Sequence, residues 1–328
     1  MARLGMVVYH GLDSGTELGT YGRLAEDAGF ESLWVTERYF HEETFSMLGY
    51  LAAVTSDLKL GLGVTNPYTR HPALLAMCSA TLDRLCGGRF LLGLGRSDRA
   101  MIQEHLGIPY HRPRSVLEET VTVLRELLGG RRVSGTVGAF RLRNVGLALA
   151  PVQASLPIYL AAIGPRALRL AGAVADGVLL NAYVPTNYVR YAVETVHQAA
   201  REAGRDPQTI EIACMLVMRL TTAPESLFPG LKQRLVRLLT EPHVGEILLE
   251  QSGFDPGMLA ALRSVVDQRG EQAGVHYITD AMVEEFYVLG SAQACRQRVE
   301  AYRQAGVTLP LLLPRLHDYG AVVEAFRQ

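Results

Sequence analysis

The 328-residue sequence is poor in cysteine and has no excess of charge of either sign. Its four cysteines form no CxxC pair and no metal-ligand spacing, so the sequence indicates neither a disulfide scaffold nor a metal site. Lys and Arg number 32 against 33 Asp and Glu, which gives no electrostatic reason to expect nucleic acid or an anionic membrane as a partner. The cysteines read as reduced, mostly buried thiols, and we therefore expect a cytoplasmic protein.

Several familiar motifs are also absent. No run of 18 uncharged apolar residues is present, so no membrane span is expected, and residues 1–11 read as a first strand rather than a signal peptide. HExxH, G-x-S-x-G and a P-loop lysine are missing, which argues against a zinc protease, a serine hydrolase and a P-loop enzyme. Residues 9–13 lack the glycine fingerprint of a dinucleotide-binding fold.

The sequence does contain a regular alternation of short apolar runs with helical periods. The runs predict eight strands, at residues 4–9, 32–36, 58–64, 88–95, 157–162, 177–181, 209–219 and 309–313. This alternation predicts an α/β fold, a (β/α)8 TIM barrel in a single domain over residues 1–328, with a doubly wound open sheet as the alternative. Residues 133–142 predict a β-hairpin. Residues 222–275 predict a helical insertion after strand 7, placed over the barrel mouth or in a dimer contact.

Residues 60–72 carry the most informative strand exit and read LGLGVTNPYTRHP. Gly61 and Gly63 alternate within the predicted third strand, which permits either tight barrel packing or close approach of a ligand to the backbone. A hydroxyl, an amide and a cation follow, supplied by Thr65, Asn66 and Arg70. In a parallel α/β fold this carboxyl end of the strand is where ligands bind.

Two further strand exits have a similar character. Residues 93–98 read GLGRSD, in which Asp98 could either meet a ligand or cap the next helix. Residues 161–168 read AAIGPRAL, and a glycine and a proline before a helix leave free N–H groups that favour an anion.

These three segments, together with residues 290–307, resemble the bacterial-luciferase-like flavin and deazaflavin oxidoreductases. The nearest subgroup is the coenzyme F420-dependent methylenetetrahydromethanopterin reductases. The resemblance implies a non-prolyl cis peptide between Gly63 and Val64, against which the cofactor ring rests. It also implies that the cofactor is coenzyme F420 (8-hydroxy-5-deazaflavin), with FMN as the alternative. The implied cofactor-binding residues are Gly63, Val64, Thr65, Asn66, Gly95, Arg96, Ser97, Ala161, Ala162, Ile163, Gly164, Pro165 and Arg166.

We predict a reductase that transfers hydride to a C=C or C=N bond of a small or natural-product substrate, with Glu37, Tyr9 and Asp98 at the reacting face. One alternative is an FMN-dependent luciferase-like monooxygenase. Because Arg38 and Tyr39 stand where the family has an imidazole, a catalytically inactive cofactor-binding homologue is a second alternative. The family resemblance also implies a homodimer.

Overall fold

Eight parallel strands close on themselves in the order β1-β2-β3-β4-β7-β8-β9-β11, with β11 returning to β1. The structure is a computed structural model and describes residues 3–328. The strands are β1 (Gly5–Val8), β2 (Ser32–Val35), β3 (Lys59–Thr65), β4 (Phe90–Leu94), β7 (Ile158–Ala162), β8 (Gly177–Leu180), β9 (Glu211–Leu220) and β11 (Leu309–Leu313). The predicted (β/α)8 barrel is confirmed, and each strand begins and ends within two residues of its predicted range.

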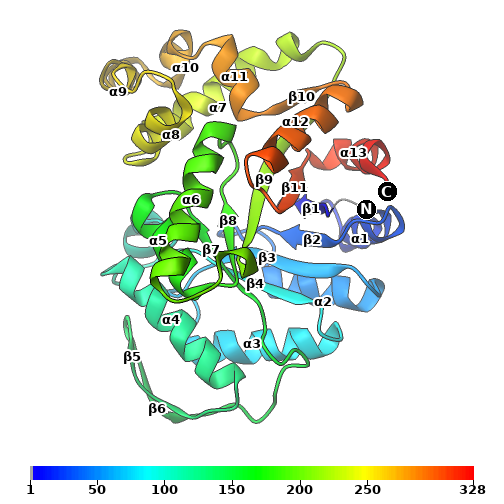
Figure 1. Cartoon of the computed structure of the whole chain (residues 1–328), viewed down its shortest axis with the longest axis vertical. Helices are drawn as coiled ribbons and strands as arrows, with labels where there is room; N and C mark the ends of the chain where they lie inside the picture. The colour runs from blue at the N-terminus through cyan, green and yellow to red at the C-terminus, as the bar shows by residue number, and fades with distance from the viewer. Residues whose placement is uncertain (1–2) are drawn as a thin grey trace.

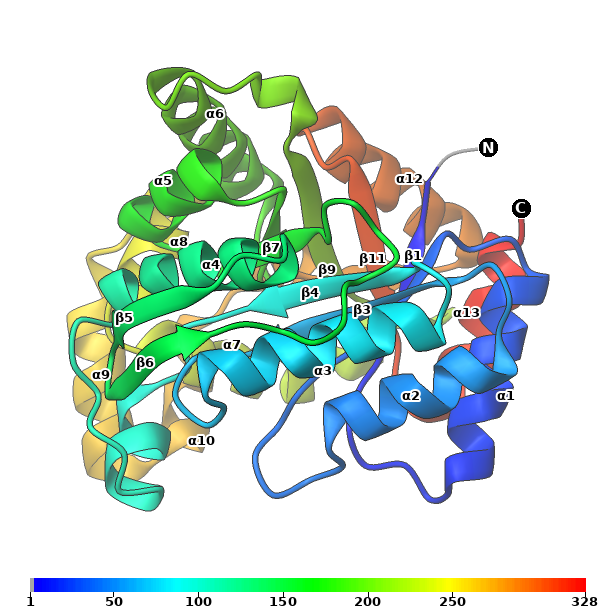
Figure 2. The ribbon, with the colours of Figure 1, turned by 90° about the horizontal axis from the view of Figure 1, so that it is seen from below.

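Helices cover the outside of the barrel (Figures 1 and 2). Their starts follow local sequence: Ser14 caps the first helix, and Pro72 occupies the first turn of the third, where His71 Nδ1 accepts the Ala73 N–H at 3.1 Å. They are α1 (Gly15–Asp27), α2 (Thr44–Val54), α3 (Pro72–Leu85), α4 (Pro113–Leu128), α5 (Pro165–Val174), α6 (Thr186–Glu202), α12 (Ala292–Gln304) and α13 (Tyr319–Phe326).

A buried indole occupies part of the barrel interior. Trp34 of β2 is fully buried, and its ring occupies the space into which a side chain on Gly61 would point. Its Nε1 donates to Ser32 Oγ at 3.1 Å, and Tyr159 meets its face edge-on at 5.1 Å between ring centroids. Close packing therefore accounts for Gly61, because any larger residue on β3 would displace the indole.

Two additions stand outside the eight repeats. The predicted hairpin is confirmed as β5 (Val133–Val137) and β6 (Phe140–Val145). Figure 1 shows it at one end of the molecule, with a group of helices at the other end. That group comprises α7 (Phe228–Thr240), α8 (Val244–Ser252), α9 (Met258–Arg269), α10 (Glu271–Gly274) and α11 (Asp280–Phe286).

A short strand that we did not predict follows this helical segment. β10 (Val288–Gly290) pairs in parallel with the end of β9, where Val288 lies opposite Met218. Three residues are too few to show an alternating pattern, so the sequence alone did not reveal it. Within residues 3–328, no helix combines the length and apolar character needed to cross a membrane.

Candidate active site

The carboxyl ends of three strands meet above the barrel interior. A Cβ atom placed on Gly63 would lie 3.0 Å from Met215 Cε and 3.4 Å from Leu179 Cδ2, so Gly63 faces the upper layer of the interior. A Cβ on Gly95 would lie 2.7 Å from Val64 Cγ2 and 3.6 Å from Ala161 Cβ. The side chain of Val64 therefore packs over the buried backbone of Gly95, beside Ala161, where the ends of β3, β4 and β7 meet. The Gly63–Val64 peptide is cis, as the resemblance implied.

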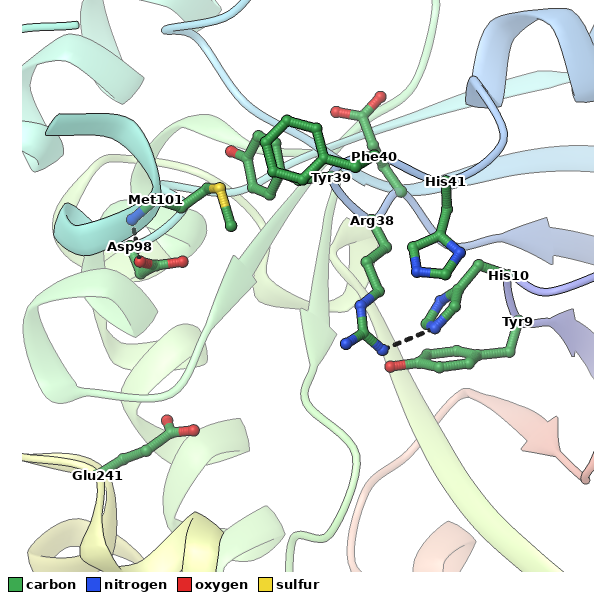
Figure 3. A pocket seen from close by; sticks show the side chains of 10 residues that line it. Tyr9, His10, Arg38, Tyr39, Phe40, His41, Asp98, Met101 and Glu241 are labelled. Atoms are coloured by element: carbon green, nitrogen blue, oxygen red, sulfur yellow. Dashed lines mark hydrogen bonds between the residues drawn. The ribbon is translucent and has the colours of Figure 1, made fainter. Parts of the chain in front are cut away.

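A cavity of about 750 Å³ opens beyond the ends of β1, β2 and β4 (Figure 3), and Gly63, Val64, Gly95 and Ala161 are not among the residues that line it. The three residues predicted for the reacting face, Tyr9, Glu37 and Asp98, all line it. Figure 3 shows Tyr9, His10, Arg38 and His41 together, with Asp98 and Met101 across the cavity. The remaining lining residues, which are not among the three predicted for the reacting face, are His10, Arg38, Tyr39, Phe40, His41, Met101 and Glu241.

Glu37 is held in an ion pair rather than left free in the cavity. Arg70 Nη1 lies 2.7 Å from Glu37 Oε2 and donates to Oε1 at 2.9 Å, and the Thr65 hydroxyl also donates to Oε1 at 2.9 Å. Arg70 Nη2 donates to Glu43 Oε1 at 2.6 Å. Burial opposes the charged form of Arg70, but the two carboxylates outweigh it and its pKa is raised. Glu37 therefore joins the ends of β2 and β3.

Tyr39 is the centre of a second hydrogen-bond group, which joins the same loops to β4. The amide nitrogen of Asn66 donates to the Tyr39 hydroxyl at 3.0 Å, and this hydroxyl lies 2.5 Å from Ser97 Oγ. Asn66 is fixed in turn, because its Oδ1 accepts the N–H groups of Tyr68 and Thr69 at 3.0 Å each. Burial is the main cause that raises the pKa of Tyr39, so its hydroxyl keeps its proton at neutral pH.

His10 faces the cavity as a neutral imidazole. Arg38 Nη1 donates to its Nε2 at 2.8 Å, which requires an unprotonated acceptor nitrogen there. Burial, followed by the charges of Arg38 and His41, lowers the pKa of His10 to about 4. Tyr9 stacks on His10 with 3.8 Å between ring centroids, and His41 lies 4.3 Å away on the same measure.

Two carboxylates face the cavity from its other side. Asp98 Oδ1 accepts the Met101 N–H at 2.7 Å and so caps the short helix Ala100–His105, the role that we had weighed against ligand binding. Glu241 reaches the cavity from the end of α7, and burial and then Asp98 raise its pKa. No local pattern marks Glu241, because only the packing of the helical segment brings it here.

The remaining predicted cofactor residues lie at the end of β7 and the start of α5. Gly164 begins this helix without a side-chain cap, and Pro165 occupies its first turn, so free N–H groups remain at the helix start. Ile247 of α8 lies 3.4 Å from the position of a Cβ on Gly164. These residues do not line the 750 Å³ cavity. Ala161 adjoins Gly95, and Ala162 is buried. The backbone carbonyl of Ile163 accepts a hydrogen bond from the Tyr188 hydroxyl at 2.6 Å. Arg166 is exposed, as is Arg96 after β4.

A family model described as luciferase-like monooxygenase matches residues 2–309. The chain belongs to this luciferase-like family. It is 32% identical over 297 residues to 5,10-methylenetetrahydromethanopterin reductase of Methanolobus tindarius, which covers 89% of this chain and 88% of that protein. It is 36% identical to a phthiodiolone/phenolphthiodiolone dimycocerosates ketoreductase of Mycobacterium bovis, over 88% of this chain and 78% of the relative.

A solved structure agrees with these sequence relatives. The coenzyme F420-dependent tetrahydromethanopterin reductase of Methanopyrus kandleri superposes with a TM-score of 0.85 at 26% identity, covering 100% of this luciferase-like chain and 97% of the other.

A flat ring with an anionic tail fits the residues present. Gly95 is buried and lets Val64 pack closely over it, and the partly exposed Val64 and Ala161 offer small apolar side chains to a planar ring. α5 follows β7, which is the strand next to β4, and the uncapped start of α5 offers backbone N–H groups to a phosphate.

Proposed function

We propose that this protein is a coenzyme F420-dependent oxidoreductase that transfers hydride to a small-molecule substrate. The observation that carries the proposal is the small apolar surface of Val64 and Ala161 at the carboxyl ends of β3 and β7, at the same end of the barrel as a cavity lined by polar side chains. The names of the methylenetetrahydromethanopterin reductases to which the chain is similar support the choice of cofactor. When bound, the deazaflavin supplies hydride.

The chain's own residues would position the ring and exclude water. Val64 and Ala161 would contact one face of the ring, Thr65, Asn66 and Ser97 would border it, and Gly164, Pro165 and Arg166 would hold the phosphate-bearing tail. Glu37 then acts by positioning, because Arg70 and Thr65 already occupy its oxygens and fix the loop after β3. Such positioning is the main contribution of a protein to cofactor chemistry.

The proton that accompanies hydride transfer would come from the cavity side. Tyr39 is suited to this, because Asn66 donates to its hydroxyl oxygen and burial keeps it protonated. Tyr9 and Asp98 line the cavity on opposite sides and would contact the substrate. The tyrosine therefore takes the place of the imidazole that the sequence lacks, and this favours an active enzyme over an inactive homologue.

For the substrate we propose an electrophilic C=N or C=C bond, as predicted from the resemblance. A second candidate is a carbonyl group, because the 36% identical mycobacterial relative is named a ketoreductase. An FMN-dependent monooxygenase on the same barrel is the competing activity, since the matching family model carries that description.

The decisive experiment mixes the purified protein, without oxygen, with reduced F420 and with reduced FMN in separate samples. A panel containing an imine-bearing pterin, an activated alkene and a ketone is added to each. We expect the visible absorbance of oxidised F420 to appear with at least one of these substrates. Oxygen consumption and substrate oxygenation with reduced FMN, and no reaction with F420, would instead identify a monooxygenase.

We also propose that the protein is a homodimer. Among residues 3–328, five of the seven exposed large apolar residues lie on α2, on α3 or in the loop before β7: Tyr50, Leu74, Met77, Leu85 and Val152. On α3 the spacing of Leu74, Met77 and Leu85 places them along one side of the helix. A patch of this kind on adjacent elements is typical of a self-complementary interface around a two-fold axis.

A further inference from the structure

One arginine at the barrel mouth, Arg219, forms no ion pair with a carboxylate of the described residues, 3–328. Arg219 lies near the end of β9, where side chains alternate between the barrel interior and the surrounding helices. Met215 of the same strand packs against the Gly63 position, which lies in the interior. Arg219 follows Met215 by four residues, which is two periods of this alternation. Its side chain therefore lies on the same side of the strand as Met215, at the mouth of the barrel.

The hydrogen-bonding groups of Arg219 are incompletely used. Its Nη1 donates to the Met218 carbonyl at 2.5 Å, while its buried Nε has no partner among residues 3–328. Within the same residues, no carboxylate lies at ion-pair distance from its guanidinium. A largely buried cation without a partner is costly, so a group that completes its hydrogen bonds would be bound favourably.

Other partly buried arginines of this chain either meet carboxylates or, like Arg89 and Arg205, donate to several backbone carbonyls. Arg70 meets Glu37 and Glu43, and Arg298 lies 2.9 Å from Glu285. Arg219 differs because its charged neighbour is a second cation, Arg315, which follows β11 on the adjacent strand.

The other titratable groups around Arg219 are Tyr183, Tyr287 and Asp318. Asp318 lies 3.5 Å from His317, within reach of another partner. Tyr183 packs edge-on against Tyr287, with 5.2 Å between ring centroids. Burial and then Arg315 lower the pKa of Arg219, so its surroundings disfavour the cation and leave an excess of positive charge for an incoming anion.

We propose that Arg219, together with Arg315, forms an anion-binding subsite at the β9–β11 side of the mouth that takes a carboxylate or phosphate group of the substrate. This inference rests on the proposed function for its location in a catalytic mouth. The strand order β9-β11-β1 places Arg219 two strands from Tyr9. At about 4.8 Å per strand, the anionic group of the substrate would lie roughly 10 Å from the reacting face.

The phosphate-bearing tail of the cofactor is a second anionic group that would fit this subsite. We assign the subsite to the substrate because the start of α5, on β7, already offers N–H groups to a phosphate. Strand order alone does not choose between the two, because β9 lies two strands from β1, which leads to Tyr9, and also two strands from β7, which leads to α5.

Inorganic phosphate is the probe for the subsite itself. The full-length protein without cofactor is titrated with phosphate at constant ionic strength, and the thermal unfolding midpoint is recorded. Arg219→Gln and Arg315→Gln are compared with the wild type, and Arg201→Gln serves as the control because Arg201 is an exposed residue of α6 paired with Glu194. We expect phosphate to stabilise the wild type and the control, and to bind Arg219→Gln about tenfold or more weakly, as loss of a charged hydrogen bond implies.

Equal phosphate binding by Arg219→Gln and Arg201→Gln, or no phosphate binding by the wild type, would overturn the proposal. If Arg219→Gln does not fold, Arg219→Lys provides the test, because it keeps the charge and removes the planar fork. It should bind phosphate more weakly than the wild type.

A titration with F420 separates the two sources of the anion. Unchanged F420 affinity in Arg219→Gln supports the assignment to the substrate, whereas a parallel loss of F420 affinity overturns it. Arg219-dependent phosphate binding in a protein that binds no F420 would retain the anion subsite and refute the proposed function.

Discussion

The guanidinium of Arg70 forms an ion pair with the carboxylate of Glu37 and so links the loops that follow two neighbouring strands, β2 and β3. Their side chains are only 16% and 13% exposed, and the pair fixes the loop that carries Thr65 and Asn66. The two residues are 33 positions apart, so the loops after β2 and β3 are held together by a contact that no local sequence pattern encodes.

Breaking this pair should destabilise the fold. Glu37→Gln removes the charge that partners a mostly buried arginine, and we expect it to lower the free energy of unfolding by about 1–3 kcal/mol in urea. The control is Arg201→Ala, which removes an exposed pair with Glu194 and should cost about 0–1 kcal/mol. Equal losses in the two variants would show that the Arg70–Glu37 pair has no special role.

The apolar surface beside Gly95 should be essential for cofactor binding. Gly95→Ala places a methyl group 2.7 Å from Val64 Cγ2 and pushes the valine toward the proposed ring position. We expect F420 affinity, measured by fluorescence titration, to fall at least tenfold. Gly49→Ala is the matched control, because a Cβ there meets nothing within 4 Å and sits in the middle of α2. Unaltered F420 affinity in Gly95→Ala would remove the surface from the cofactor site.

Removing one oxygen from Tyr39 tests the proton donor. Tyr39→Phe keeps the ring and removes the hydroxyl that meets Asn66 and Ser97, so we expect the rate of hydride transfer to fall roughly 100-fold or more while F420 affinity stays within twofold. Tyr110→Phe serves as the control, since it loses a 3.3 Å bond to Ser97 O outside the cavity. A Tyr39→Phe enzyme with full activity would assign the proton to another group.

His10 should make the protein less stable in mild acid. Its pKa is lowered to about 4 in the folded state against 6.5 for the ordinary side chain. Between these values the unfolded chain binds a proton that the folded protein does not, so stability is present above pH 6.5 and is lost as the pH falls toward 4. His10→Gln should flatten this part of the profile when unfolding is measured by urea at a series of pH values. An unchanged slope would contradict the neutral imidazole.

A charge on the exposed side of α3 should disrupt the proposed homodimer. Met77→Asp places a carboxylate within the apolar stripe, and we expect light scattering after size-exclusion chromatography to change from twice the chain mass to the mass of one chain. Thr122→Asp on the exposed side of α4 is the control and should not alter the mass. A wild type that is monomeric at every concentration would refute the dimer itself.

The sequence revealed the barrel because each strand is a compact apolar run followed by a helical period. It located the strand exits as well, and Tyr9, Glu37 and Asp98 do line one cavity. It did not reveal that Glu37 is tied to Arg70, or that Tyr39 lies between Asn66 and Ser97, because these contacts depend on how separate loops meet. Glu241 and β10 were missed for related reasons, one set by helix packing and the other too short to show a period.

Glu241 contributes to the cavity from the end of α7, whereas the other residues lining that cavity come from loops that follow β1, β2 and β4. One wall is therefore carried by a segment that takes no part in closing the eight-stranded cylinder. Substitutions at the end of α7 can therefore change this wall while the eight strands keep their packing, which gives a protein engineer a region in which selectivity can be varied independently of the scaffold.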